Sequence, residues 1–308
     1  ERSVQDTVFA NTALGGYALA AAKFAQETVA IGFGAGQHHS GSFNTLVGRG
    51  AGNKIYSGSY STHIGYLSGQ YATGSNNTFV GSQAGVGGVT ALPHSSGENS
   101  VALGSQALYS FTTGDSNIAI GYQAGYLISS GSDNVVMGYH AGYSLGGTTM
   151  NVMIGNYAGA RSKVINNRQV FVGDSSGRYV DTGLANVAIG WHAMESAAGS
   201  TDNNASYNVA IGYQALEKIT DANSNTAVGK EAGQNITTGA FNTFIGNNAG
   251  QASVTSTQNV MIGLSAGLQG TDVDSTVLIG SNAGRSITAD GTIAIGYESG
   301  YGLTTASG

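Results

Sequence analysis

Hydrophobic and small residues alternate in a nine-residue phrase that recurs seventeen times along the chain. The phrase is clearest in Asn186-Val-Ala-Ile-Gly-Trp-His-Ala-Met194 and Asn117-Ile-Ala-Ile-Gly-Tyr-Gln-Ala-Gly125. Its second residue is Thr, Val or Ile and its fourth is aliphatic in every copy, and alternation with a period of two is the spacing of a β-strand. Seventeen residues is the commonest distance between copies. The pattern predicts an all-β fold, a parallel β-solenoid or β-roll of about 17 rungs over residues 11–300.

The third residue of the phrase is apolar in sixteen copies, and only His63 departs from this pattern. Strands that are apolar on both faces are covered on both faces. We expect the second and fourth residues to line the core of each rung and the third to meet another copy of the same chain. The interface candidates at the third position are Phe79, Val136, Met153, Phe171, Ala188, Ala210, Phe244 and Met261.

The remaining positions of the phrase favour turns and close packing. The first residue is Asn in eleven copies, and stacked Asn side chains are expected to form a ladder from rung to rung. The fifth is always Gly, which suits a positive φ or a close approach of two backbones. The eighth is always Ala or Ser, so it has little room.

Composition narrows the choice of function. Charged residues make up 9% of the chain and the formal net charge is −6, which excludes a basic surface for nucleic acid. There is no cysteine, which excludes disulfides and cysteine-bound metals. No apolar run has the length of a membrane span, so we expect no membrane insertion. The repeat runs nearly unbroken, which predicts a single repeat domain over residues 1–308. Both ends resemble truncated rungs of a longer chain.

Receptor contacts are expected where the uniform repeat is interrupted or carries aromatic rings. Long connectors at 86–99 and 195–207 fit either a binding loop or neutral variation in a tolerant turn. Aromatic residues at the sixth position, with polar neighbours, would suit sugar rings, whose apolar faces stack on aromatics; a purely structural ladder is the other interpretation. The receptor-binding candidates are Leu92, Pro93, His94, Tyr122, Tyr139, Trp191, His192, Ser196, Thr201, Asp202, Asn203 and Tyr213.

The sequence offers little support for an enzyme. Residues 173–177 and 263–267 match the G-x-S-x-G pattern of serine hydrolases, but both are simply positions five to nine of the phrase. Glycine-rich segments at 32–36 and 48–52 are in frame with the repeat and lack the Gly-Lys-Ser/Thr of a phosphate-binding loop. We expect no catalytic residues, no metal site and no cofactor.

The phrase Asn-Val-Ala-Ile-Gly-x-x-Ala resembles the head repeats of trimeric autotransporter adhesins, which form a left-handed parallel β-roll with three chains side by side. Its longer form, Gly-Tyr-Gln-Ala-Gly at 121–125, is similar to repeats of phage tail fibres, commonly upstream of a self-cleaving intramolecular chaperone. The resemblance implies a homotrimeric, left-handed fibre whose partner is a cell-surface receptor, with a glycan favoured. It implies location in a virion tail fibre, or alternatively on the surface of a bacterium as an adhesin. A structural spacer without receptor contacts is a further alternative.

Overall fold

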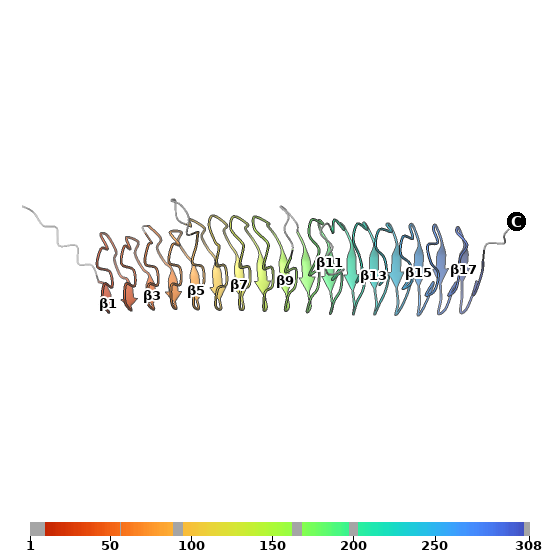
Figure 1. Ribbon diagram of the computed structural model, residues 1–308, viewed down its shortest axis with the longest axis horizontal. Coiled ribbons are helices and arrows are strands. Elements are labelled where there is room, and N and C mark those ends of the chain that lie inside the picture. The colour runs from red at the N-terminus through yellow and green to blue at the C-terminus, as the bar shows by residue number, and fades with distance from the viewer. Residues whose placement is uncertain (1–9, 56, 89–94, 162–167, 197–202, 305–308) are drawn as a thin grey trace, which may run out of the picture. The chain divides into compact units, whose positions relative to one another are not determined.

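The computed structural model describes residues 10–55, 57–88, 95–161, 168–196 and 203–304. Across these residues it is an all-β, parallel β-solenoid in which every copy of the phrase supplies one three-residue strand from its second to its fourth position (Figure 1). The strands are β1 (Thr12–Leu14), β2 (Val29–Ile31), β3 (Thr45–Val47), β4 (Thr62–Ile64), β5 (Thr78–Val80), β6 (Val101–Leu103), β7 (Ile118–Ile120), β8 (Val135–Met137), β9 (Val152–Ile154), β10 (Val170–Val172), β11 (Val187–Ile189), β12 (Val209–Ile211), β13 (Thr226–Val228), β14 (Thr243–Ile245), β15 (Val260–Ile262), β16 (Val277–Ile279) and β17 (Ile293–Ile295).

The chain divides into two compact units, residues 1–136 and 137–308. In the first unit each of β1 to β6 pairs in parallel with the strand that follows it, and in the second unit each of β9 to β16 does the same. Equivalent positions pair throughout; for example, Ala188 lies opposite Ala210. The predicted parallel solenoid is therefore confirmed within each unit, and the single repeat domain over 1–308 stays a prediction.

The prediction of which strand face is buried was wrong. The third position of the phrase points into the chain's own interior, and the side chains at all eight interface candidates are fully buried there: Phe79, Val136, Met153, Phe171, Ala188, Ala210, Phe244 and Met261. The physical reason is that the coil of each rung covers one face of its strand without help from a second chain. These eight residues are core residues and offer no surface to a partner.

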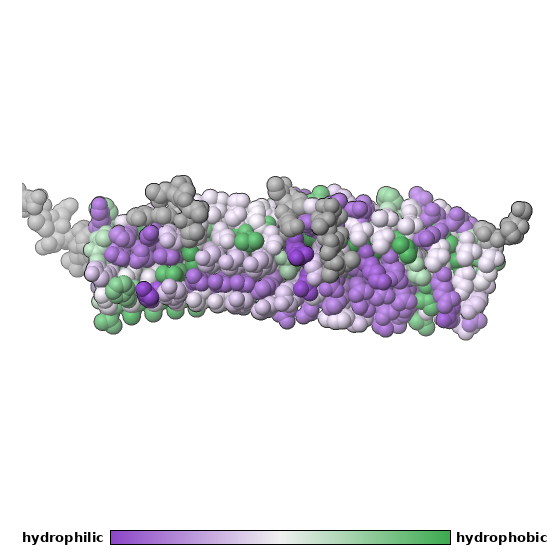
Figure 2. Space-filling view, in the orientation of Figure 1, coloured by the Kyte–Doolittle hydropathy of each residue, from purple (hydrophilic) through white to green (hydrophobic). Residues whose placement is uncertain are grey.

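The second and fourth positions point outward instead. Most fourth-position aliphatic side chains are partly exposed, and Ile154, Ile189 and Ile211 are 37%, 38% and 37% exposed. Figure 2 shows hydrophobic side chains gathered along the lower edge of the first unit, on the side where Figure 1 places its strands. Each unit thus carries two outward columns on its parallel sheet, an aliphatic column at the fourth position and a column of Val, Ile or Thr at the second.

The expected asparagine ladder is present and buried. In the second unit the Asn242 amide donates to Asn225 Oδ1 at 2.9 Å, and its own oxygen accepts from the Asn259 amide at 3.0 Å. Each side chain also binds backbone; Asn242 Nδ2 lies 2.7 Å from the carbonyl oxygen of Ser256. The ladder satisfies buried polar groups that would otherwise cost free energy.

The fifth-position glycines serve a close approach between rungs. Gly190 has a φ of 136°, and a Cβ added to it would lie 2.5 Å from the carbonyl oxygen of Gly212 in the next rung. No other residue fits such a contact, since backbone cannot move aside. The small eighth residue is also explained, because Ala35, Ala193 and Ala215 are fully buried.

Part of the core lies outside the phrase, at the twelfth position of many of the described rungs. Buried side chains there include Ile55, Phe111, Ile128, Leu145, Val180, Ile219, Ile236 and Ile287. This segment was predicted to be a connector between phrases. In the part of the chain that the structure describes, there is no helix long and apolar enough to cross a membrane.

Candidate functional site

The candidate site of the second unit lies on the turn that follows each strand. There the backbone of the seventh position is left-handed in every rung; φ is 54° at His140, 55° at Tyr157 and 55° at His192. Residues other than glycine rarely adopt this conformation. Here the repeat imposes it, so the side chains at the seventh position have fixed directions.

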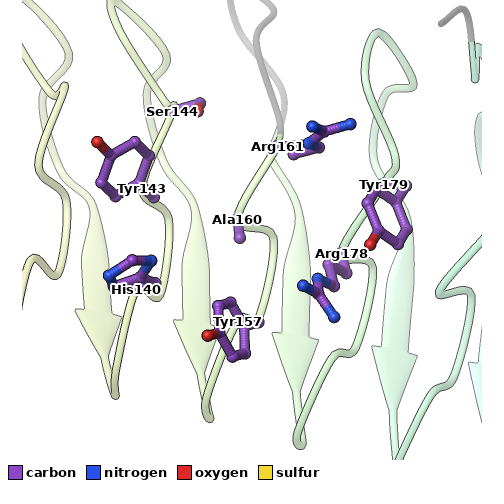
Figure 3. Close-up of a pocket in the computed structure, with 8 residues that line it drawn as sticks. All are labelled: His140, Tyr143, Ser144, Tyr157, Ala160, Arg161, Arg178 and Tyr179. Carbon is purple, nitrogen blue, oxygen red and sulfur yellow. The ribbon is translucent and has the colours of Figure 1, made fainter. Parts of the chain in front are cut away.

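A pocket of about 590 Å³ opens on this turn, within the range of small-molecule sites, roughly 300–1,000 Å³ (Figure 3). Side chains from three successive rungs surround the small Ala160 side chain. The lining residues are His140, Tyr143, Ser144, Tyr157, Ala160, Arg161, Arg178 and Tyr179.

Two arginines converge on one tyrosine ring of the pocket. The guanidinium carbon of Arg178 lies 5.1 Å from the centre of the Tyr179 ring, and that of Arg161 lies 5.4 Å from it. Arg178 is also 4.4 Å from the centre of the Tyr157 ring. Such cation–π contacts orient a guanidinium before any ligand arrives, and a planar guanidinium binds carboxylates with two parallel hydrogen bonds.

The other side of the pocket is aromatic. The ring of His140 stacks on Tyr139 at 4.2 Å and on Tyr143 at 5.1 Å, and meets Tyr157 edge-on at 5.5 Å. Burial lowers the pKa of His140, which favours the neutral imidazole at pH 7. A neutral imidazole offers both a donor and an acceptor, as a sugar hydroxyl requires.

A second aromatic group lies on the next two rungs, after β11 and β12. The Trp191 ring stacks on Tyr213 at 4.8 Å with an angle of 21° between the planes, and on His192 at 3.5 Å. Trp191 and Tyr213 remain 43% and 42% exposed. They form a flat apolar platform at the surface.

His192 also joins two glutamates from adjacent rungs. Its Nδ1 is 2.5 Å from Glu195 Oε2 and 4.0 Å from Glu217 Oε1. Burial raises the pKa of Glu195. The neighbouring His192, and Arg178 at 3.8 Å, act in the opposite direction on this pKa. Gln214 and Gln234 donate to the two oxygens of Glu217 at 2.7 Å each. The ligand atoms of the three residues lie within 4.8 Å of one another, a group that could hold a metal ion where the sequence analysis expected no metal site. In the structure His192 contacts Glu195 directly, whereas Glu217 is held by Gln214 and Gln234.

The structure brings together only some of the predicted receptor contacts. Trp191, His192 and Tyr213 form one group, Tyr139 lies beside the pocket, and Tyr122 belongs to the first unit. Two predictions were wrong, because Ser196 and Asn203 are buried, and the Asn203 amide donates to the carbonyl oxygen of Ile219 at 2.9 Å. The other candidates lie outside the described residues: Leu92, Pro93, His94, Thr201 and Asp202.

Sequence reasoning missed the pocket itself. Its arginines and two of its tyrosines, Tyr143 and Tyr179, stand just after the phrase, where no repeating residue type draws attention to them. The sequence did contain one signal. Once the rung length is known, residues at the tenth and eleventh positions of consecutive rungs can be aligned and are expected to lie side by side.

Comparison with models of known protein families gives no match, and comparison with curated proteins gives none either. The functional argument therefore depends on the geometry of the turn.

Proposed function

We propose that this chain is a segment of a fibrous attachment protein that binds a glycan on a cell surface. The supporting observation is the group of exposed aromatic rings and arginines held on the turns of β8 to β12 by a repetitive framework. Exposed aromatic residues beside polar groups suit sugar rings, and a rigid framework lowers the entropic cost of binding. The chain is proposed to act by binding and not as an enzyme.

The proposed assembly is a homotrimer that packs through the outward aliphatic columns. The second and fourth positions present Val, Ile, Leu or Thr on nearly every rung, and a second copy offers the same columns at the same rung spacing. Such a match in period favours self-association over a partner of unrelated structure. Three copies of a weak glycan site on one body would gain avidity on a dense surface.

The proposed setting is a phage tail fibre, where the segment would attach the virion to a bacterium. The repeat phrase also resembles adhesin heads, so a bacterial surface adhesin is the alternative setting. The two differ in target: a tail fibre binds bacterial cells, and an adhesin head binds host tissue or matrix.

Binding of the fluorescently labelled protein to panels of bacterial and animal cells tests this proposal. We expect attachment to cells of one panel, and we expect Trp191→Ala to weaken it at least fivefold while the sedimentation profile stays unchanged. The matched control is Tyr66→Ala, which removes an exposed sixth-position ring from the first unit, 45% exposed. Attachment to no cell of either panel would contradict the proposal and favour a structural spacer.

A further inference from the structure

The pocket around Ala160 exists because one side chain in a column of larger ones is small. Ala160 occupies the tenth position of its rung, where the neighbouring rungs carry Tyr143 and Arg178. Figure 3 shows the larger side chains arranged around it, with Tyr143 and His140 on one side and Arg178 and Tyr179 on the other. Removal of one side chain from the column leaves a recess of about 590 Å³ with fixed walls.

The charge of this recess differs from that of the chain. The chain has a formal net charge of −6 and six arginines, two of which line this pocket. Arg178 lies 3.8 Å from Glu195, whereas no carboxylate among the described residues pairs with Arg161. The described residues that line the pocket include these two arginines and no aspartate or glutamate.

We infer that this pocket binds the acidic residue of a glycan, a sugar ring that carries a carboxylate. The inference rests on the proposed attachment function and names the class of its ligand. The carboxylate would accept hydrogen bonds from Arg178 and Arg161, which are oriented by the rings of Tyr157 and Tyr179.

The rest of the pocket matches the remainder of such a ring. The apolar face of the sugar would lie over Ala160 and against the aromatic rings of the wall. Hydroxyl groups of Tyr143, Tyr157 and Ser144 line the same space and can donate to or accept from sugar hydroxyls. A neutral sugar would make the same ring contacts but supply no carboxylate to Arg161 or to Arg178, of which only Arg178 has an ion-pair partner among the described residues.

The test compares each acidic sugar with its own methyl ester, which keeps the ring and removes the charge. Methyl glycosides of glucuronic, galacturonic and N-acetylneuraminic acid, each beside its ester, are titrated into the full chain and followed by NMR or calorimetry. We expect at least one acid to bind tenfold or more tightly than its ester, with an affinity that falls as salt is added.

Three variants separate charge from shape. Arg178→Gln and Arg161→Gln should each reduce the preference for the acid at least fivefold. Ala160→Gln should abolish binding by filling the recess, although it removes no charge. The matched control is Arg285→Gln, because Arg285 holds the same tenth position as Arg178 in a rung outside the pocket. It should leave binding unchanged.

Two outcomes overturn the inference: no acid binds better than its ester, or Ala160→Gln binds the preferred acid as well as the parent. These outcomes are separate from failure of the proposed function. A chain that attaches to cells but prefers no acid keeps the attachment function and loses this ligand class. A chain that binds an acidic sugar in the pocket but attaches to no cell keeps this ligand class and loses the attachment function.

Discussion

The seventh position of the repeat behaves differently in the two units. In the first unit Gln83, Gln106 and Gln123 form a ladder in which each amide donates to the preceding side chain, at 3.0 and 2.6 Å. In the second unit the same position holds His140 and Tyr157, whose rings line a pocket. The glutamines are joined by hydrogen bonds along their column, whereas the rings of His140 and Tyr157 meet edge-on at 5.5 Å and border a space that a ligand could enter.

The interior differs from this surface column. Its side chains vary in size from rung to rung, yet they remain buried. Where the third residue is Phe, as at Phe244, the ninth is Gly, and a Cβ on Gly250 would overlap the Phe244 ring. Where the ninth residue is large, as at Leu216, the third is Ala210, and both are fully buried. In these rungs the two positions share one space, so a large residue at one position is matched by a small residue at the other.

The largest expected effect comes from emptying that space. Phe244→Ala removes a fully buried ring and should lower the free energy of unfolding by about 3–5 kcal/mol. Phe241→Ala, three residues earlier and 61% exposed, should change it by no more than about 0.5 kcal/mol. Chemical denaturation of both variants measures the difference. Equal effects would mean that the interior is not packed as described.

The next effect concerns His63, the one polar residue in the third column. It is fully buried and stacks on Phe79 at 5.1 Å, and neither of its ring nitrogens has a hydrogen-bond partner. Burial lowers its pKa to about 3, and burial also lowers the pKa of His39 to about 4, both from 6.5. The stability of the first unit should therefore depend on pH through these two buried histidines. The glutamine ladder on its surface has no titratable group and adds no such dependence.

The sign follows from proton uptake. Below about pH 6.5 the unfolded chain binds protons at these histidines, while the folded chain does not until the pH falls to about 4 for His39 and 3 for His63. Stability is therefore complete above pH 6.5 and decreases as the pH falls. Between pH 7 and pH 4, His63 alone should account for a loss of about 3 kcal/mol.

The variant His63→Leu tests this dependence, because Leu46 shows that leucine fits the same column in the preceding rung. Denaturation at pH 7 and pH 4 should give a smaller loss of stability for the variant than for the parent. An identical loss would show that His63 is protonated as readily in the folded chain as in the unfolded one.

These results show how much the sequence could predict. Alternation with a period of two predicted every strand, and the spacing of Asn predicted the buried ladder. Alternation alone does not say which face is inside when both are apolar, and the third column was assigned to the wrong side. The exchange of size between third and ninth residues, as in Phe244 with Gly250 and Ala210 with Leu216, was present in the sequence and identifies the inward face.

The pocket could not be predicted in the same way. It is formed by residues at the tenth and eleventh positions, such as Ala160 and Arg178, which contact one another only because consecutive rungs have matched lengths. Trp191 and Tyr213 were predictable because a ring at the sixth position recurs.

A smaller effect should separate the buried ladder from the exposed one. Asn242→Ala removes the acceptor of the Asn259 backbone N–H and the donor to the Ser256 carbonyl in a buried site, which should cost about 2 kcal/mol. Gln106→Ala breaks the glutamine ladder, which remains open to water, and should cost no more than about 0.5 kcal/mol. Thermal unfolding of both variants measures the contrast. A larger loss of stability for Gln106→Ala than for Asn242→Ala would show that the glutamine ladder, and not the asparagine ladder, contributes more to the stack.

The smallest effect on folding is expected at the fourth position, where the side chain faces outward. Ile211→Asp places a carboxylate at a side chain that is 37% exposed, so within one chain it should cost about 1 kcal/mol or less. If the aliphatic columns form the proposed trimer interface, the same change puts a charge between chains and should shift the protein towards monomer in sedimentation experiments. Ala210→Asp, one residue earlier and fully buried, should instead prevent folding at any concentration. A folded Ile211→Asp variant that keeps the parent's mass would show that the outward columns are not the interface.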